Sequence, residues 1–111
     1  MDINIKTIRN ASVVEMIGDL DGSTAAAAQE KILPLVEPGC KVVLDMTRVP
    51  YMSSAGLRVL LLIYRKISGS DGTVVLVGLS EELQDTMSVT GFLDFFTLYD
   101  DLGKGLDAVN S

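Results

Sequence analysis

The sequence predicts one α/β domain over residues 1–111, in which helices pack on a mixed β-sheet with the element order ββαβαβαβα. Two short apolar runs, at residues 41–45 and 73–77, have the composition of central strands that are covered on both faces. A strongly amphipathic segment at residues 54–67 lies between these runs. Because strands that alternate with helices form parallel pairs joined by helical crossovers, these observations predict an α/β fold.

The first third of the chain predicts a hairpin followed by a helix. Residues 3–8 alternate imperfectly between apolar and polar, residues 10–12 suit a turn, and residues 13–17 follow as a second strand. Ser23 or Thr24 is then positioned to cap a helix that runs toward Leu35. Pro34 lies inside this helical pattern, so the helix should kink or end near Leu33.

The helix expected at residues 54–67 has the clearest pattern in the chain. Its apolar residues recur at helical intervals, which predicts one face packed on the sheet: Leu57, Leu60, Leu61, Tyr64 and Ile67. The strand residues expected to be buried beneath this face are Val42, Val43, Leu44, Val74, Val75 and Leu76.

The last third of the chain predicts two more helices around a short strand. Ser80, which is followed by two acidic residues, should begin a helix that Gly91 ends. Residues 95–98 predict a short last strand. Asp100 or Asp101 should start a final helix that carries Leu102, Leu106 and Val109.

The composition argues against several classes of function. The formal net charge of −6 argues against binding to nucleic acid or to anionic membrane surfaces. Histidine is absent, which removes Ser-His-Asp catalysis, histidine metal sites and phosphohistidine carriers. The chain has no glycine motif for a nucleotide phosphate, and its loop at residues 18–22 lacks the later ligands of a calcium loop. We therefore expect neither a bound nucleotide nor a metal ion in this chain.

The cysteine count and the hydropathy pattern predict a cytoplasmic protein. The one cysteine, Cys40, cannot form an internal disulfide, which favours a reducing compartment. The first residues lack the basic flank and apolar run of a signal peptide. The longest apolar run, residues 59–64, is far too short to insert across a membrane.

Two adjacent serines at the start of the central helix offer a modification site. If Ser53 is the N-cap, Met52 and Leu57 take the two positions of a hydrophobic staple. Ser53 should then turn its oxygen onto the helix backbone, whereas Ser54 should keep its hydroxyl free. A helix N-terminus has partial positive charge and free N–H groups, so it tolerates an added phosphate. The alternative is that both serines merely suit a helix start.

Acidic residues provide two further candidates. Asp19 and Asp21 precede the first helix, where loop solvation or capping is the alternative to a binding role. Asp45 is expected to end a central strand, where a carboxylate can serve as a phosphoacceptor, so a small phosphoreceiver is another alternative. That interpretation requires an acidic pair after the first strand, where this chain has residues 9–11, Arg-Asn-Ala.

Three segments carry a family resemblance that covers essentially the whole chain. Residues 44–57, LDMTRVPYMSSAGL, are similar to the pattern D-L-S-x-V-x-F/Y-M-D-S-S/T-G-L. Residues 17–25, IGDLDGSTA, are similar to G-E-L-D-x-x-T-A, and residues 91–96, GFLDFF, are similar to G-L-x-x-x-F. These are patterns of the anti-sigma factor antagonists, the single-domain members of the STAS family, which the chain therefore resembles. Ser53 stands where many members have Asp, and Ala55 where they have Ser or Thr.

The resemblance implies a STAS-type domain that acts as a bacterial partner switch, is not an enzyme and carries no cofactor. The unphosphorylated protein would bind an anti-sigma factor that is also an ATP-dependent serine kinase, phosphorylation would release it, and a serine phosphatase would reset the protein. The phosphorylated residue implied by the family motif is Ser54. The residues expected to form the partner-binding surface are Asp19, Asp21, Ser53, Ser54 and Gly56. A constitutive STAS interaction or scaffold subunit, for example one associated with a transporter, is the alternative in which Ser54 is not phosphorylated.

Overall fold

The computed structural model describes residues 1–111 and contains a five-stranded sheet, four α-helices and two short 3₁₀ turns, Leu33–Leu35 and Phe92–Phe95. The predicted fold class and the order ββαβαβαβα are confirmed. In chain order the elements are β1 (Asp2–Ile8), β2 (Ala11–Ile17), α1 (Ala25–Ile32), β3 (Lys41–Arg48), α2 (Ser54–Gly69), β4 (Thr73–Val77), α3 (Glu81–Val89), β5 (Thr97–Tyr99) and α4 (Leu102–Val109).

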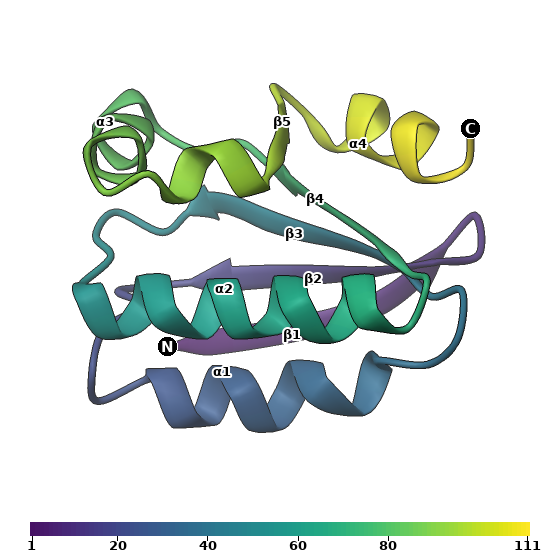
Figure 1. Ribbon diagram of the computed structural model, residues 1–111, viewed down its shortest axis with the longest axis horizontal. Coiled ribbons are helices and arrows are strands. Elements are labelled where there is room, and N and C mark those ends of the chain that lie inside the picture. Colours follow the sequence, from purple (N-terminus) through teal and green to yellow (C-terminus); the bar gives the residue numbers. More distant parts are fainter.

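The five strands lie in the sheet in the order in which they occur in the chain, with β1 and β5 at its edges. The β1–β2 pair is an antiparallel hairpin, and the pairs that follow it are parallel. Right-handed crossovers between successive neighbours bring α1, α2 and α3 to the same face of the sheet. Figure 1 shows α1 and α2 running alongside each other, and α4 packs on the other face.

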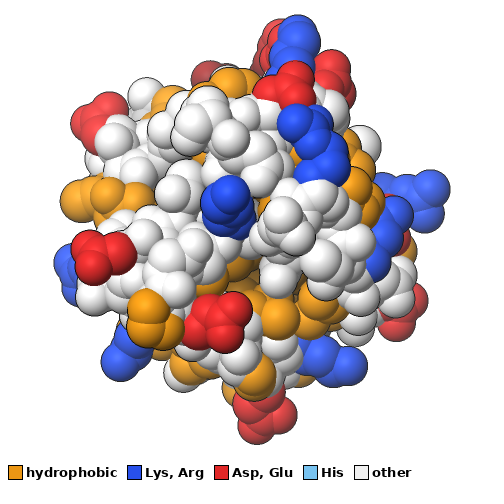
Figure 2. All heavy atoms as spheres, turned by 90° about the vertical axis from the view of Figure 1, so that its right-hand side faces the viewer, with side chains coloured by type: hydrophobic (Ala, Val, Ile, Leu, Met, Phe, Trp, Pro, Cys, Tyr) orange, Lys and Arg blue, Asp and Glu red, His pale blue; other side chains and the backbone are white.

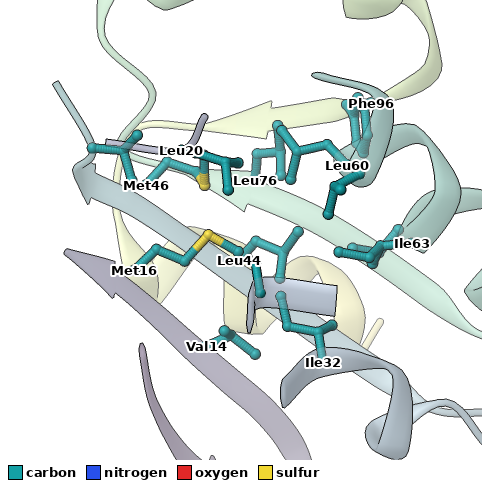
Figure 3. Packing of buried hydrophobic residues seen from close by; sticks show 14 of the residues in the cluster. Val14, Met16, Leu20, Ile32, Leu44, Met46, Leu60, Ile63, Leu76 and Phe96 are labelled. Atoms are coloured by element: carbon teal, nitrogen blue, oxygen red, sulfur yellow. The ribbon is translucent and has the colours of Figure 1, made fainter. Parts of the chain in front are cut away.

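The core has two layers because successive strand residues point to opposite faces. In β3, Val42 and Leu44 join the large cluster beneath α1, α2 and α3, whereas Val43 joins the smaller cluster beneath α4. Figure 3 shows the large cluster, where Leu44 of the sheet lies close to Leu60 and Ile63 of α2. The burial expected of the central strands is confirmed for Val42, Val43, Leu44, Val74, Val75 and Leu76.

The N-terminal turn lies one residue earlier than predicted. It consists of Arg9 and Asn10, which both have positive φ angles of 52° and 65°, and Ala11 already belongs to β2. A two-residue turn with this backbone matches the twist of a hairpin, which explains the difference. The end of α1 at Ile32 is as predicted, because Pro34 lies in the 3₁₀ turn that follows.

The buried face of α2 is only partly the predicted one. Leu57, Leu60 and Ile67 are buried, but Leu61 and Tyr64 are half-buried. Ile63, which the sequence pattern did not select, is fully buried. Gly56, Leu60, Ile63 and Ile67 recur at helical intervals, so the buried face is rotated about the helix axis from the predicted one.

The C-terminal elements confirm the predicted helices but move the last strand. Gly91 has a φ of 78° directly after α3, and Asp101 caps α4 by accepting a hydrogen bond from the Lys104 amide at 2.9 Å. The strand predicted at residues 95–98 begins at Thr97 instead. The residues before it form a 3₁₀ turn, because the rings of Phe95 and Phe96 pack on Tyr64 of α2, at centroid distances of 5.8 and 5.4 Å.

Candidate functional site

The candidate site lies on two neighbouring loops that continue the pairing of β2 with β3. Leu20 and Met52 form an isolated parallel bridge beyond the ends of the two strands, and both side chains are buried. The Leu20 amide donates to the Tyr51 carbonyl at 3.0 Å, and the Leu20 carbonyl accepts from the Ser53 amide at 2.9 Å. These bonds hold the loop that contains Asp19 and Asp21 against the start of α2.

Gly56 allows the two loops to approach each other this closely. It lies in the first turn of α2 and is buried. A Cβ at this position would clash with the carbonyl oxygen of Leu20 and would lie 3.0 Å from the Cγ atoms of Leu20 and Met52. Gly56 therefore supports the predicted binding surface from beneath, and a partner would meet its neighbours first.

The two serines have the different environments that the staple predicts. Ser53 is the N-cap of α2, and its Oγ accepts a hydrogen bond from the Gly56 amide at 3.3 Å. Ser54 occupies the first helical position and is exposed, and its hydroxyl has no hydrogen-bond partner within the chain. The predicted cap is confirmed, and the Ser54 hydroxyl is accessible to an enzyme that approaches from solvent.

Asp21 stabilises the loop before α1 while keeping one carboxylate oxygen free. Its Oδ1 accepts from the Ser23 hydroxyl at 2.7 Å and from the Ser23 amide at 2.9 Å. These two hydrogen bonds, the hydroxyl bond first, stabilise the ionised form and hold the pKa of Asp21 below its ordinary value. Its Oδ2 makes no hydrogen bond within the chain. The side chain of Asp21 therefore stabilises its own loop and does not cap α1, and its Oδ2 is available to a binding partner.

Thr24 fixes the shape of this acidic loop. Its hydroxyl donates to the carbonyl of Asp19 and accepts from the amide of Asp21, each at 2.9 Å. This use of the hydroxyl explains why Thr24, although it is the N-cap of α1, makes no side-chain bond to that helix. The loop also reaches the first turn of α2, since a methyl group at Gly22 would lie 4.0 Å from Ala55 Cβ.

The electrostatics of the site combine a helix N-terminus with acidic neighbours. The amides of Gly56 and Leu57 in the first turn of α2 bond to Ser53, and the aligned peptide dipoles give this end of the helix a partial positive charge. Asp19, which is exposed, and the half-buried Asp21 lie on the adjoining loop. Figure 2 shows the opposite end of the molecule, where positive and negative side chains are interspersed. A phosphate on Ser54 would be tolerated by its own helix, but it would make the surrounding surface strongly negative.

Tyr51 is a candidate binding residue that the sequence analysis did not select. It lies in the loop before α2 and is 54% exposed, although its carbonyl oxygen is fixed by the Leu20 amide. Exposed tyrosines on rigid backbone are favoured positions for strong contacts at protein interfaces. Its place three residues before Ser54, in the loop that leads into α2, was the available signal.

The sequence analysis expected Asp45 to end its strand, and this expectation is wrong. Strand β3 continues to Arg48, and Asp45 is half-buried within it. Its Oδ1 accepts from the Thr47 hydroxyl at 2.6 Å and from the Thr47 amide at 3.0 Å, so it is engaged with its own strand. No three His, Cys, Asp or Glu side chains gather closely enough to hold a metal ion.

None of the helices combines the length and the apolar character that crossing a lipid bilayer requires.

Comparison with known proteins finds a family model that matches the chain and several similar proteins. The family model named STAS domain matches residues 2–105. The anti-sigma-B factor antagonist of Bacillus subtilis is 29% identical over 98 residues, which cover 88% of this chain and 90% of that protein. A crystal structure of an anti-sigma factor antagonist from Mycobacterium paratuberculosis superposes with a TM-score of 0.86 at 27% identity, covering 99% of this chain and 94% of that chain.

The same fold also occurs inside a much larger protein. The structure of the murine anion transporter Slc26a9 matches with a TM-score of 0.82 at 12% identity, covering 95% of this chain and 18% of that chain. A likeness at this identity shows the fold alone. The fold is therefore compatible with more than one function, and the site residues have to distinguish between them.

Proposed function

The chain belongs to the STAS domain family, and we propose that it is an anti-sigma factor antagonist that works as a phosphorylation-controlled partner switch. In its unphosphorylated form the protein binds an anti-sigma factor that is also an ATP-dependent serine kinase. The kinase phosphorylates Ser54, the complex dissociates, and a serine phosphatase restores the binding form. The exchange takes place in the bacterial cytoplasm. The chain itself is not an enzyme, and ATP is bound by its partner.

The observation that carries this proposal is the difference between Ser53 and Ser54. The hydroxyl of Ser53 is engaged with the helix backbone, whereas that of Ser54 is exposed and has no partner in the chain. A kinase requires a hydroxyl that it can reach without unfolding its substrate, and Ser54 meets this condition. The similarity to anti-sigma factor antagonists over most of the chain supports the same assignment.

The surface around Ser54 suits a contact that a phosphate can disrupt. Tyr51 offers an exposed aromatic ring, and Asp21 offers a free Oδ2 on a loop that hydrogen bonds hold in place. A partner that contacts this surface must accept carboxylates near a neutral hydroxyl. Phosphorylation adds about −1.5 to −2 charges at neutral pH, and at a tight interface the added charge and bulk disfavour binding. The helix dipole reduces the cost of this charge within the free protein, so the domain should stay folded.

The test is to combine the protein with the anti-sigma factor kinase of its native host and ATP. We expect Ser54→Ala to keep partner binding within about threefold, because the change removes only a hydroxyl at an exposed helix start. The same change should abolish phosphorylation. Ser54→Asp should weaken binding, although a single carboxylate imitates a phosphate incompletely in charge and in oxygen number. Fragment mass spectrometry identifies the modified residue, and calorimetric titration gives the affinity.

Ser53→Ala is the matched control, since it removes the neighbouring hydroxyl. We expect it to lower stability by about 1 kcal/mol through loss of the cap and to leave phosphorylation at Ser54 intact. Phosphate on Ser53 would disprove the assignment of Ser54. Persistent partner binding without phosphorylation by any host kinase would favour the constitutive scaffold subunit. Retained binding by Ser54→Asp would favour the same alternative.

Asp21→Asn tests the contribution of the acidic loop to partner binding. The substitution keeps an oxygen that can accept the Ser23 hydrogen bonds, but it removes the negative charge and changes the free Oδ2. We expect weaker partner binding with an unchanged fold. If affinity and stability are both unchanged, Asp21 serves only its own loop.

A further inference from the structure

Strand β1 is a free edge of the sheet. It pairs with β2 on one side only, and most of its residues are exposed. The Ile8–Ala11 pair closes the two-residue turn, so its backbone groups bond to each other across the hairpin. Counting back from Ile8, every second residue of β1 likewise directs its N–H and C=O groups toward β2. The N–H and C=O groups of Ile3, Ile5 and Thr7 therefore point away from the sheet. A free edge of this kind is a template for a further strand.

The sequence of this edge is complementary to itself in the antiparallel sense. From Asp2 to Lys6 it reads Asp-Ile-Asn-Ile-Lys, which is symmetric about Asn4 except that its two ends carry opposite charges. We propose that a second copy of this chain binds at β1 through a two-fold axis at Asn4, which joins the two sheets into one. Asp2 of each copy then lies opposite Lys6 of the other, and Ile3 lies opposite Ile5. This proposal is independent of the function proposed for Ser54.

The backbone supports this register over its neighbours. The proposed register pairs Ile3 with Ile5, whose backbone groups both point outward, so that each pair can exchange hydrogen bonds. It also places Asp2 opposite Lys6 in the pairs without backbone bonds, where side chains lie closest. A shift to pair Ile5 with Ile5 would place Asp2 opposite Ile8. A shift to pair Ile3 with Ile3 would place Asp2 opposite Asn4. Only the proposed register matches opposite charges.

The surface beside β1 has room for an added strand. A hollow of about 300 Å³ lies along the edge between β1 and α1, and its lining residues are Met1, Asp2, Ile3, Asn4, Ala27 and Lys31. Ile5, on the same face of the strand as Ile3, is 38% exposed. The apolar side chains of a second β1 would enter this hollow, because they project to the same face of the extended sheet. The polar face, with Asp2, Asn4 and Lys6, remains in contact with water.

The test uses charge reversal at the two paired positions in the untagged chain. A strand-edge contact is smaller than a standard interface, so we expect the wild type to dimerise between about 10 μM and 1 mM in sedimentation equilibrium. Asp2→Lys places lysine opposite lysine at both ends of the pair, and Lys6→Asp places aspartate opposite aspartate. Each variant alone should dimerise at least about tenfold more weakly. An equimolar mixture of the two variants should associate again to within about threefold of the wild type, because opposite charges then face each other in the mixed dimer.

Two controls change net charge equally at distant exposed positions, Lys66→Asp on α2 and Glu37→Lys in the loop before β3. Both should leave dimerisation unchanged. If the wild type stays monomeric at about 1 mM, the proposal is wrong. This outcome also covers the case in which β1 binds other proteins but not a second copy of the chain. Single variants that dimerise like the wild type, or a mixture that fails to associate, overturn the proposal as well.

Discussion

Replacing Gly56 with alanine tests whether the acidic loop and the start of α2 form one rigid surface. A Cβ at this position would clash with the Leu20 carbonyl oxygen and crowd Met52. Overpacking of this kind costs about 1–3 kcal/mol, and displacement of Leu20 also weakens its hydrogen bond from the Ser53 amide, worth about 1 kcal/mol. Alanine recovers about 1 kcal/mol through its higher helix propensity. We expect Gly56→Ala to lower the free energy of unfolding by about 1–3 kcal/mol.

The assay is equilibrium denaturation in urea, with Gly69→Ala as the matched control. Gly69 lies at the other end of the same helix, and a Cβ there would meet no atom within 4 Å. Alanine at this position should leave stability unchanged or raise it by up to about 1 kcal/mol. Partner binding should weaken in the Gly56 variant and not in the control, because only the former displaces the loop of Asp19 and Asp21. A Gly56→Ala protein as stable as the control would refute the close approach of Leu20 to the helix.

Two further predictions concern the core and the acidic loop. Leu60 is fully buried between α2 and the sheet, so Leu60→Ala should lower the free energy of unfolding by about 2–5 kcal/mol in chemical denaturation. A decrease below about 0.5 kcal/mol would mean that the buried face of α2 is wrongly assigned. Asp21 has a lowered pKa in the folded state, so its contribution to stability is present above its unfolded pKa of about 3.9 and is lost as pH falls through the folded value. Asp21→Asn should therefore reduce the loss of stability below about pH 4, which thermal unfolding at a series of pH values measures. If the variant loses as much stability in acid as the wild type, the hydrogen bonds of Ser23 do not favour the ionised form.

The difference between the two serines could be predicted from the sequence because it depends on local contacts. A helix N-terminus is decided within a few residues, here by Met52 and Leu57 on either side of the Ser53 cap. The central strands could be predicted for a similar reason. Strands covered on both faces are apolar at every position, and the runs that contain Val43 and Val75 meet this condition.

The buried face of α2 and the last strand could be predicted only in part. Periodicity finds the apolar side of a helix, but α2 is apolar over a wide arc, and the packing of the domain decides which part of this arc, including Ile63, is buried. The start of β5 depends on Tyr64, a residue more than thirty positions away, whose ring holds Phe95 and Phe96 outside the strand. Short edge strands have few residues to signal their register, so distant packing decides where they begin.

The sequence by itself determined the fold class, the order of the elements and the choice of Ser53 as the cap, because patterning and capping are properties of neighbouring residues. The family resemblance placed Asp19 and Asp21 on one expected surface with Ser54, but only the tertiary structure decided how their loop lies against the start of α2. That contact depends on the pairing of Leu20 with Met52 and on the space above Gly56, which separate parts of the chain supply together. Non-local contacts of this kind form through the packing of the whole domain, and no local pattern encodes them.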